Sequence, residues 1–401
     1  MDKELKGKHI MVLIAMCGSI GAGIGLVTNC AGLFFEPIAE EFGIGKGDAG
    51  LTLTICNLFY ALGGILCPKI LKEKTFRIMN FICMVILVSF TALLSAASDI
   101  RIMYLFSGLR GLAAGTIGMV YVTMIINSWF HKNTGLVLSL VLCFSGIVSA
   151  LLSPSLSSLI QNHGWRIGYL VVAFLSLLFI LPSVLLPIGL TPAAVGTVPY
   201  GEKEAQVSEE TEEKSEVRIS LFIMGIVCAI ISTYMTSMPQ HFPSMALSFG
   251  FDISLGAAMI SASMAANTLG KIVFGILVDR FGIRISLTLY ASLVVAGILC
   301  LGLIRTPFFM LTGAVAFGMV YSVAAVGNTL LTRDIFTDRN YGKVYPKISM
   351  YGTIANALGA SIIGFLYDIS GSYRSTLLMV FCMMLSYLVI LQLMYRIKQK
   401  S

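Results

Sequence analysis

Two basic residues lie deep inside long apolar stretches of the sequence, where a charge is costly. Arg110 is in the first half of the chain, and Lys271 is in the second, four residues after Asn267. On a helix, that spacing puts Asn267 and Lys271 on one face. Because an unpaired buried cation needs a counter-charge, the pattern predicts a site for a small anion such as a carboxylate. Two alternatives stay open: Lys271 bonds to helix carbonyls or extends toward the surface, and Arg110 braces neighbouring helices.

Uncharged polar side chains at similar depth are further candidate ligands. These residues could line a cavity, or each could bridge two helices. The set comprises Asn57, Tyr121, Asn328 and Asn356.

Proton coupling would require a group that changes its protonation state. Glu36 and His241 are the best candidates, and the alternative is that both are interfacial and solvated. Exchange or uniport is expected if neither of them titrates.

Enzymatic chemistry and resident cofactors are not predicted. The nine cysteines fall singly within apolar runs, without a Cys-x-x-Cys pair, which indicates packing residues and no metal site. A nucleotide-binding loop and a nucleophile with a placed base are both missing from the sequence. A transported substrate is therefore expected to be driven by gradients.

The composition places the chain in a bilayer. Charged residues make up 12% and hydrophobic residues 57%, too apolar for a water-facing surface. Since a helix needs about 20 apolar residues to cross the hydrocarbon, the sequence predicts an all-α membrane protein with twelve transmembrane helices. They are expected near residues 10–35, 49–68, 78–97, 101–127, 134–159, 166–189, 219–240, 253–277, 284–304, 307–331, 343–367 and 373–396.

The two halves of the chain repeat one another. Phe42-Gly43 recurs as Phe249-Gly250, and Gly135 recurs as Gly342, at a constant offset of 207 residues. Such a repeat predicts two parallel six-helix bundles with a shared substrate site between them. The expected domains are 1–189 and 219–401, joined by a flexible cytoplasmic linker over 190–218.

The loops differ in positive charge. With the N-terminus inside, the cytoplasmic loops and termini hold 20 lysines and arginines and the outer loops hold five. The positive-inside rule therefore predicts that both termini are cytoplasmic. Short loops favour the cell inner (plasma) membrane, and we expect a multi-pass monomer in contact with lipid. The basic residues lack a stacking platform, so nucleic acid is not an expected partner.

A short motif links the chain to a known family. Gly275, Asp279, Arg280, Gly282 and Arg284 lie between the eighth and ninth apolar runs. This pattern resembles the signature loop of the major facilitator superfamily. The resemblance implies the major facilitator fold and a conformational latch, with the glycine allowing close helix approach and the aspartate pairing with arginine. The first-half copy is degenerate, with Pro68 at the aspartate position.

Further motifs resemble the monocarboxylate carriers and oxalate:formate antiporters of that superfamily. They comprise Trp129, Phe130, Lys132 and Gly135; Gly164, Trp165, Arg166 and Tyr169; and Asp334, Arg339, Asn340, Tyr341 and Gly342. The resemblance implies alternating-access transport of a small organic anion, by antiport or proton symport. Lys271 stands where these carriers have arginine, which disfavours oxalate. A carrier or exporter of neutral or cationic molecules and a non-transporting membrane sensor remain alternatives.

Overall fold

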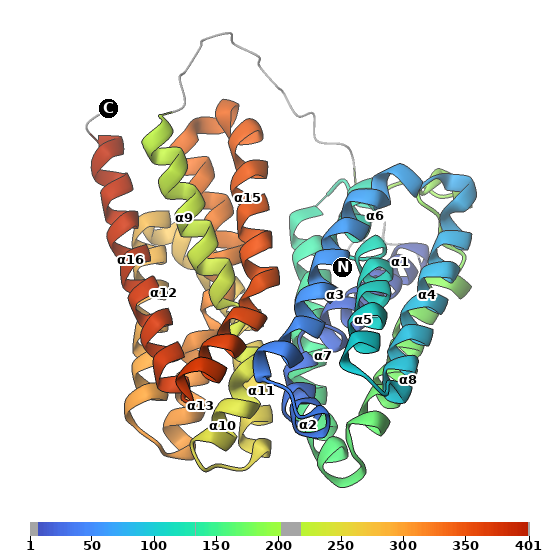
Figure 1. Ribbon diagram of the computed structural model, residues 1–401. Helices are drawn as coiled ribbons and strands as arrows, with labels where there is room; N and C mark the ends of the chain where they lie inside the picture. Colours follow the sequence, from blue (N-terminus) through green and yellow to red (C-terminus); the bar gives the residue numbers. More distant parts are fainter. Residues whose placement is uncertain (1–6, 133, 202–217, 400–401) are drawn as a thin grey trace. The chain divides into compact units, whose positions relative to one another are not determined.

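The computed structural model describes residues 7–132, 134–201 and 218–399, and in this part of the chain almost all regular structure is helical (Figure 1). The one extended pairing among the described residues is an isolated bridge between Phe130 and Tyr200. Twelve helical segments of the described chain are long and apolar enough to cross a membrane. The predicted all-α class with twelve spans is confirmed.

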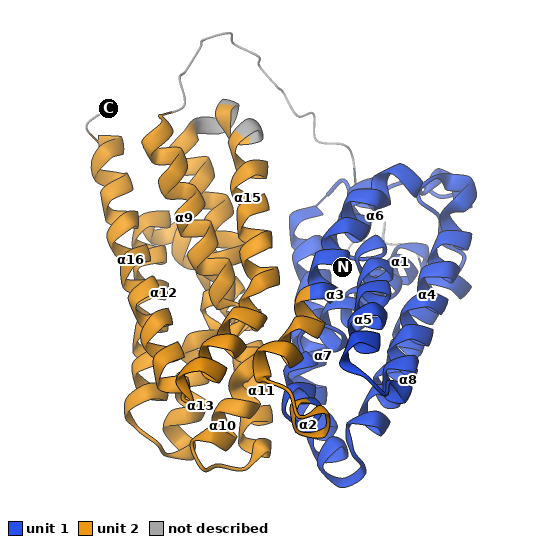
Figure 2. Cartoon of the chain, viewed as in Figure 1, with its two compact units in different colours: residues 1–38, 55–210 blue, residues 39–54, 211–401 orange. Residues whose placement is uncertain are grey.

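The chain forms two compact units, coloured separately in Figure 2. Unit 1 consists of Met1–Ile38 and Ile55–Glu210, and unit 2 of Ala39–Thr54 and Thr211–Ser401. Unit 2 thus includes a short segment from the first half of the sequence. The division into domains 1–189 and 219–401 stays a prediction.

Unit 1 carries the first helices of the chain, and two of them, α2 and α3, continue across its boundary with the segment 39–54. The elements are α1 (Gly7–Ile20), η1 (Gly21–Leu26), η2 (Ala31–Phe34), α2 (Phe35–Phe42), α3 (Lys46–Ile70), η3 (Glu73–Thr75), α4 (Phe76–Leu93), η4 (Leu94–Ala96), α5 (Ile100–Thr116), α6 (Met119–Trp129), α7 (Thr134–His163), α8 (Trp165–Leu185) and η5 (Ala193–Val195).

Unit 2 carries the remaining helices, and its longest element, α15, contributes to two of the membrane spans. The elements are α9 (Ile219–Met235), η6 (Met238–His241), α10 (Phe242–Ser248), α11 (Ile253–Phe281), α12 (Ile283–Leu303), α13 (Pro307–Gly318), α14 (Val320–Ser322), η7 (Val323–Gly327), α15 (Asn328–Ser370) and α16 (Tyr373–Gln399).

Several helices begin at residues suited to that position. The carboxylate of Asp99 accepts a hydrogen bond from the first turn of α5, and that of Asp252 does the same at α11. These bonds satisfy backbone N–H groups that lack a partner within the helix. Gly282 separates α11 from α12 with a φ of 78°, a conformation that favours glycine.

Glycines allow α3 and α5 to pack with their backbones in contact. A Cβ added at Gly111 would overlap the carbonyl oxygen of Cys56, and one added at Gly115 would overlap that of Tyr60. A side chain at either position would therefore push the two helices apart. This close seam fixes the register of α5 against α3, and with it the position of Arg110.

The expected flexible linker over 190–218 is wrong for its first part. The indole Nε1 of Trp129 donates to the carbonyl of Gly189 at 3.1 Å, and the N–H of Tyr200 donates to the carbonyl of Trp129 at 2.8 Å. These bonds hold the chain that follows α8 against the end of α6. The sequence signal was misleading because composition does not reveal the bonds that the Trp129 indole and backbone groups make here. Residues 202–217 lie outside the described residues.

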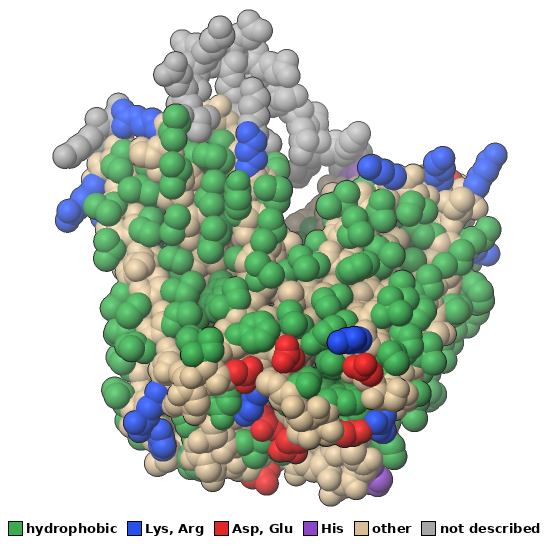
Figure 3. Space-filling view, viewed as in Figure 1, with side chains coloured by type: hydrophobic (Ala, Val, Ile, Leu, Met, Phe, Trp, Pro, Cys, Tyr) green, Lys and Arg blue, Asp and Glu red, His purple; other side chains and the backbone are tan. Residues whose placement is uncertain are grey.

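Large apolar side chains cover the middle of each unit. In the face shown in Figure 3, hydrophobic side chains form the central part of each unit, and charged side chains gather toward the ends. Leu151, Ile65 and Leu178 are among the exposed aliphatic residues. Such a surface would be unfavourable in water and is suited to contact with lipid hydrocarbon.

Candidate substrate-binding site

Arg110 is the most deeply buried cation among the sequence-predicted ligands. Its side chain is 2% exposed within unit 1. The guanidinium lies beside the thiol of Cys56 on α3 and the phenol of Tyr169 on α8, with Cζ 5.6 Å from the centre of the Tyr169 ring. Its Nε has no hydrogen-bond partner, and no carboxylate of the described chain forms an ion pair with it.

Aromatic packing positions the tyrosine that faces Arg110. The Tyr169 ring is stacked on Phe34 with centroids 4.1 Å apart and meets the edge of Trp165 at 5.9 Å. Sequence reasoning placed Tyr169 in a family-like motif but gave it no role, and it missed Phe34 and Cys56. The one signal in the sequence for Cys56 was its position next to the predicted ligand Asn57.

The surroundings of Arg110 are polarisable but not negatively charged. The π face of tyrosine attracts a cation, although more weakly than a carboxylate does. A buried guanidinium that lacks an anionic partner is costly to the protein alone. The arrangement is therefore suited to a bound molecule that brings its own negative charge.

Lys271 and Asn267 lie in α11 of unit 2, with the predicted four-residue spacing. Lys271 is half-buried and has an interaction partner in the chain, so the expectation of a residue without a partner is wrong. Asn267 is 5% exposed, and its buried Oδ1 has no hydrogen-bond partner in the described chain. The Asn267 amide thus keeps one acceptor available.

Asn328 and Asn356 bridge helices inside unit 2. The Asn328 amide donates to Ser232 Oγ at 2.9 Å, and the Asn356 amide donates to Thr236 Oγ1 at 2.6 Å. Both asparagines therefore join two helical segments, which was the alternative to lining a cavity. Their hydroxyl partners were missed, although the cluster of Ser and Thr within the apolar run of α9 was a signal.

Three other predicted residues of unit 1 differ in burial. Asn57 is half-buried in α3, and Glu36 is half-buried in the first turn of α2. Tyr121 has no exposed surface and is stacked near Phe76 in the core, with ring centroids 6.1 Å apart. Helix packing encloses the whole Tyr121 side chain, and its role as a ligand contact stays a prediction.

His241 is fully buried in unit 2, so the expectation of an interfacial, solvated ring is wrong. Its Nε2 is 2.8 Å from the carbonyl oxygen of Ala360, and its Nδ1 is 3.2 Å from the hydroxyl of Tyr373. The carbonyl can only accept, so Nε2 donates, and in the neutral ring Nδ1 accepts from Tyr373. Both nitrogens are thus occupied. A coupling role for His241 stays a prediction.

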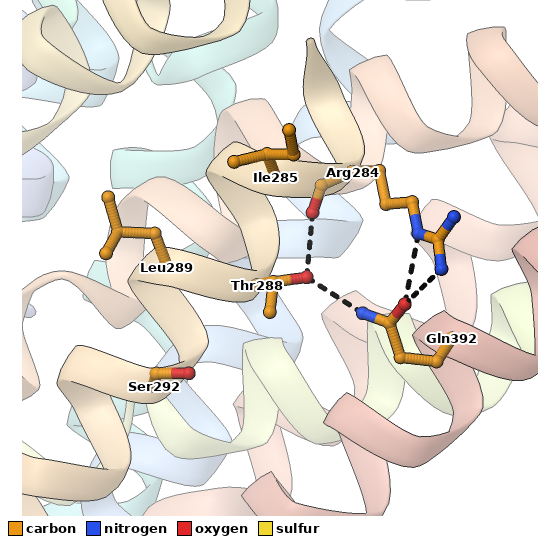
Figure 4. A pocket seen from close by; sticks show the side chains of 6 residues that line it. All are labelled: Arg284, Ile285, Thr288, Leu289, Ser292 and Gln392. Atoms are coloured by element: carbon orange, nitrogen blue, oxygen red, sulfur yellow. Dashed lines mark hydrogen bonds between the residues drawn. The ribbon is translucent and has the colours of Figure 1, made fainter. Parts of the chain in front are cut away.

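The predicted latch residues occupy the end of α11 and the start of α12. A Cβ at Gly275 would meet no atom within 4 Å, so the expected close helix approach at this glycine is wrong. Asp279 and Arg280 are exposed, and no hydrogen bond joins Asp279 to an arginine among the described residues. Arg284 instead donates from Nε and Nη2 to Oε1 of Gln392 on α16, at 3.0 and 2.6 Å (Figure 4).

A family model described as Major Facilitator Superfamily matches residues 11–259 and 221–401. The chain belongs to the major facilitator superfamily. Membership agrees with the twelve spans and makes this a multi-pass membrane protein of a transporter family. The predicted resemblance to this superfamily is confirmed.

Relatives of this major facilitator protein include monocarboxylate carriers. It is 22% identical to monocarboxylate transporter 13 of Rattus norvegicus over 71% of the chain, and 23% identical to that of Bos taurus over the same share. The chain spans 65% of the length of both relatives. It is also 25% identical to the MFS-type transporter pytF of Aspergillus terreus, over 63% of the chain and 84% of that protein.

Solved major facilitator structures share the fold. A nucleoside transporter matches with a TM-score of 0.72 and 12% identity, over 96% of this chain and 99% of its own. A D-xylose-proton symporter matches with a TM-score of 0.70 and 15% identity, over 97% and 98% of the two chains. At these identities the likeness extends to the fold alone.

Proposed function

We propose that this major facilitator protein is a secondary transporter that moves a small organic anion, a monocarboxylate, across the membrane by alternating access. The observation that carries the proposal is Arg110, which is buried in unit 1 without a carboxylate partner among the described residues. A substrate carboxylate would supply the missing charge and accept from the guanidinium. The names of the two monocarboxylate relatives support the same substrate class.

Arg110 is the principal anion ligand in this proposal. Its planar fork can hold a carboxylate with two hydrogen bonds, which a lysine cannot do. Lys271 and Asn267 of unit 2 stay candidate ligands, and the Asn267 Oδ1 could accept from a hydroxyl or a protonated acid on the substrate. Asn57 is a further candidate ligand, whereas Asn328 and Asn356 act mainly by holding their helices.

The membrane arrangement extends the sequence predictions. We place both termini in the cytoplasm because of the bias in loop charge. We also propose that the protein is a monomer of the cell inner (plasma) membrane. The substrate would be exchanged for another anion or accompanied by a proton. Glu36 remains the first group to examine for coupling, since His241 already has both ring nitrogens hydrogen-bonded.

A carrier of neutral polar molecules is the second candidate. Unit 2 contains an uncharged network in which Tyr321, Asn356 and Thr236 are joined by hydrogen bonds of 2.6 and 3.0 Å. Hydroxyl and amide groups of this kind recognise sugars and nucleosides, which are named as substrates of two structural neighbours. In that case Arg110 would act as a helix brace.

Counterflow in proteoliposomes separates these functions. Vesicles preloaded with acetate, pyruvate, D-xylose or uridine would be tested for uptake of the same labelled compound. We expect accumulation of a monocarboxylate, and at least about 30-fold slower counterflow in Arg110→Gln, since removing one partner of a buried charge pair costs about 2 kcal/mol or more.

Arg101→Gln is the matched control, because Arg101 is exposed at the start of the same helix. It should retain counterflow. Unchanged carboxylate counterflow in a folded Arg110→Gln protein would contradict the proposal. Counterflow of xylose or uridine alone would favour the second candidate.

A further inference from the structure

An open groove of about 460 Å³ lies on the surface of unit 2, next to α12 and α16. It is lined by Arg284, Ile285, Thr288, Leu289, Ser292 and Gln392. Figure 4 shows Gln392 facing both Arg284 and Thr288, while Ile285 and Leu289 extend from the same stretch of α12. The groove therefore has a polar, charged part and an apolar part side by side.

The positive charge of Arg284 is held in place but is not neutralised. Two of its N–H groups donate to Oε1 of Gln392, which is an uncharged acceptor, and its Cζ lies 5.2 Å from the Tyr395 ring. A guanidinium has five N–H groups, so three are left without an acceptor in the described chain. Gln392 is itself fixed by a bond of 2.9 Å from its amide to Thr288.

The carboxylate that Tyr395 links to this network is already engaged. Asp334 forms an ion pair with Lys398 at 3.0 Å and accepts from the Tyr395 hydroxyl at 2.8 Å. Tyr395 therefore connects Asp334 with Arg284, but the charge of Asp334 is matched by Lys398. Arg284 remains a preorganised cation with unused donors.

The position of the groove along α12 indicates what could fill it. Arg284 is the second residue of the span Ile283–Leu303, which places it at the level of the lipid headgroups. Leu289 lies about 7.5 Å deeper, at 1.5 Å per residue. Ile285 and Leu289 are 58% and 45% exposed. A ligand that contacts both parts must carry an anion at one end and a hydrocarbon chain at the other.

We propose that this groove binds the phosphate headgroup of an anionic phospholipid at Arg284, with an acyl chain along Ile285, Leu289 and Ser292. With the predicted orientation, the lipid belongs to the cytoplasmic leaflet, where anionic lipids create a negative surface potential. Free phosphate would use Arg284 but gain nothing from the apolar part. The bound lipid would hold α12 and α16 together at this end of unit 2.

The test is a lipid titration of the purified full chain, followed by thermal unfolding. Dioleoyl phosphatidylglycerol should raise the unfolding temperature more than dioleoyl phosphatidylcholine does, because only the former carries net charge. Gln392→Glu is the decisive variant: it keeps the hydrogen bonds to Arg284 but neutralises the cation. We expect the variant to bind phosphatidylglycerol roughly fivefold more weakly, whereas a merely structural Arg284 would leave lipid binding unchanged.

Two further variants and a control complete the design. Arg284→Gln should lose the preference for phosphatidylglycerol, and Ser292→Trp should weaken binding of both lipids by filling the apolar part. Arg396→Gln removes an exposed charge from the same end of α16 and should behave like the wild type. Equal effects of the two lipids on the wild type, equal losses in Gln392→Glu and Arg396→Gln, unaltered binding in Ser292→Trp, or the same stabilisation by inorganic phosphate would each overturn the proposal.

Discussion

The interiors of the two units use polar groups in different ways. In unit 1 a single guanidinium, Arg110, is buried among Tyr169, Cys56 and apolar side chains, and its Nε has no partner. In unit 2 the amides of the buried Asn328 and the half-buried Asn356 are hydrogen-bonded to hydroxyls of neighbouring segments. The charge of Arg110 is thus left without an anionic partner, whereas the amides of Asn328 and Asn356 have hydrogen-bond partners.

This difference indicates that the two units have different roles in the protein. A satisfied network stabilises helix packing and adds little to the binding of charge. An unsatisfied buried cation costs stability and is retained more readily where a ligand compensates it. Under this interpretation, unit 1 recognises the charge of the substrate, and the amide network of unit 2 maintains the helix positions.

The largest expected effect concerns the helix seam that positions Arg110. Gly111→Ala would place a Cβ against the backbone of Cys56, which cannot move aside, and should destabilise the protein by about 3 kcal/mol or more. Gly275→Ala in unit 2 is the matched control: nothing lies within 4 Å of its added Cβ, and alanine favours a helix by about 1 kcal/mol.

Thermal unfolding in detergent measures both glycine variants. A marked drop for Gly111→Ala, with no drop for Gly275→Ala, would support a rigid seam beneath the arginine. Equal unfolding temperatures would show that α3 and α5 can separate freely, and the fixed position of Arg110 would then be in doubt.

The second effect tests whether the amides of unit 2 are structural. Asn356→Ala leaves the Thr233 carbonyl without this donor and removes the bond to Thr236, which should cost about 1–3 kcal/mol of stability. The ratio of carboxylate to sugar counterflow should stay unchanged. Thermal unfolding and counterflow of the same preparation measure the two quantities. If the ratio of carboxylate to sugar counterflow changed while the stability did not, Asn356 would have to contact the substrate.

Much of the fold follows from local sequence, whereas the site follows from packing. Twelve apolar runs predict twelve spans because crossing length is a property of each segment alone. The depth of Arg110 was predicted in the same way. Its neighbour Tyr169 depends on which helices meet, so this contact was not predicted. The burial of Tyr121 and His241 also depends on which helices pack together, so it was not predicted.

The third effect separates the aromatic face of Tyr169 from its hydroxyl. Tyr169→Leu removes the ring beside Arg110 and should weaken substrate affinity about fivefold, since a partly desolvated cation–π contact contributes about 1 kcal/mol. Tyr169→Phe keeps the ring and its stack on Phe34, so its affinity should fall less. Concentration dependence of counterflow gives both values. Equal losses would assign the role to the hydroxyl.

The smallest effect concerns a helix end of unit 2 that lies outside the membrane spans. The pKa of Asp252 is lowered because the Ser254 side chain and backbone N–H both donate to its ionised carboxylate. A lowered pKa in the folded state means that the carboxylate stabilises the fold above its unfolded pKa of about 3.9. That contribution is lost as the pH falls through the lower, folded value.

Asp252→Asn keeps a capping side chain without the charge, and should cost less than about 1 kcal/mol at neutral pH. The difference in unfolding temperature between wild type and variant should therefore shrink as the pH is lowered from neutral through the folded pKa. Comparing the two proteins at each pH removes the effect of all other carboxylates. A difference that is constant with pH would mean that Asp252 stabilises α11 through its shape alone, as an uncharged cap would.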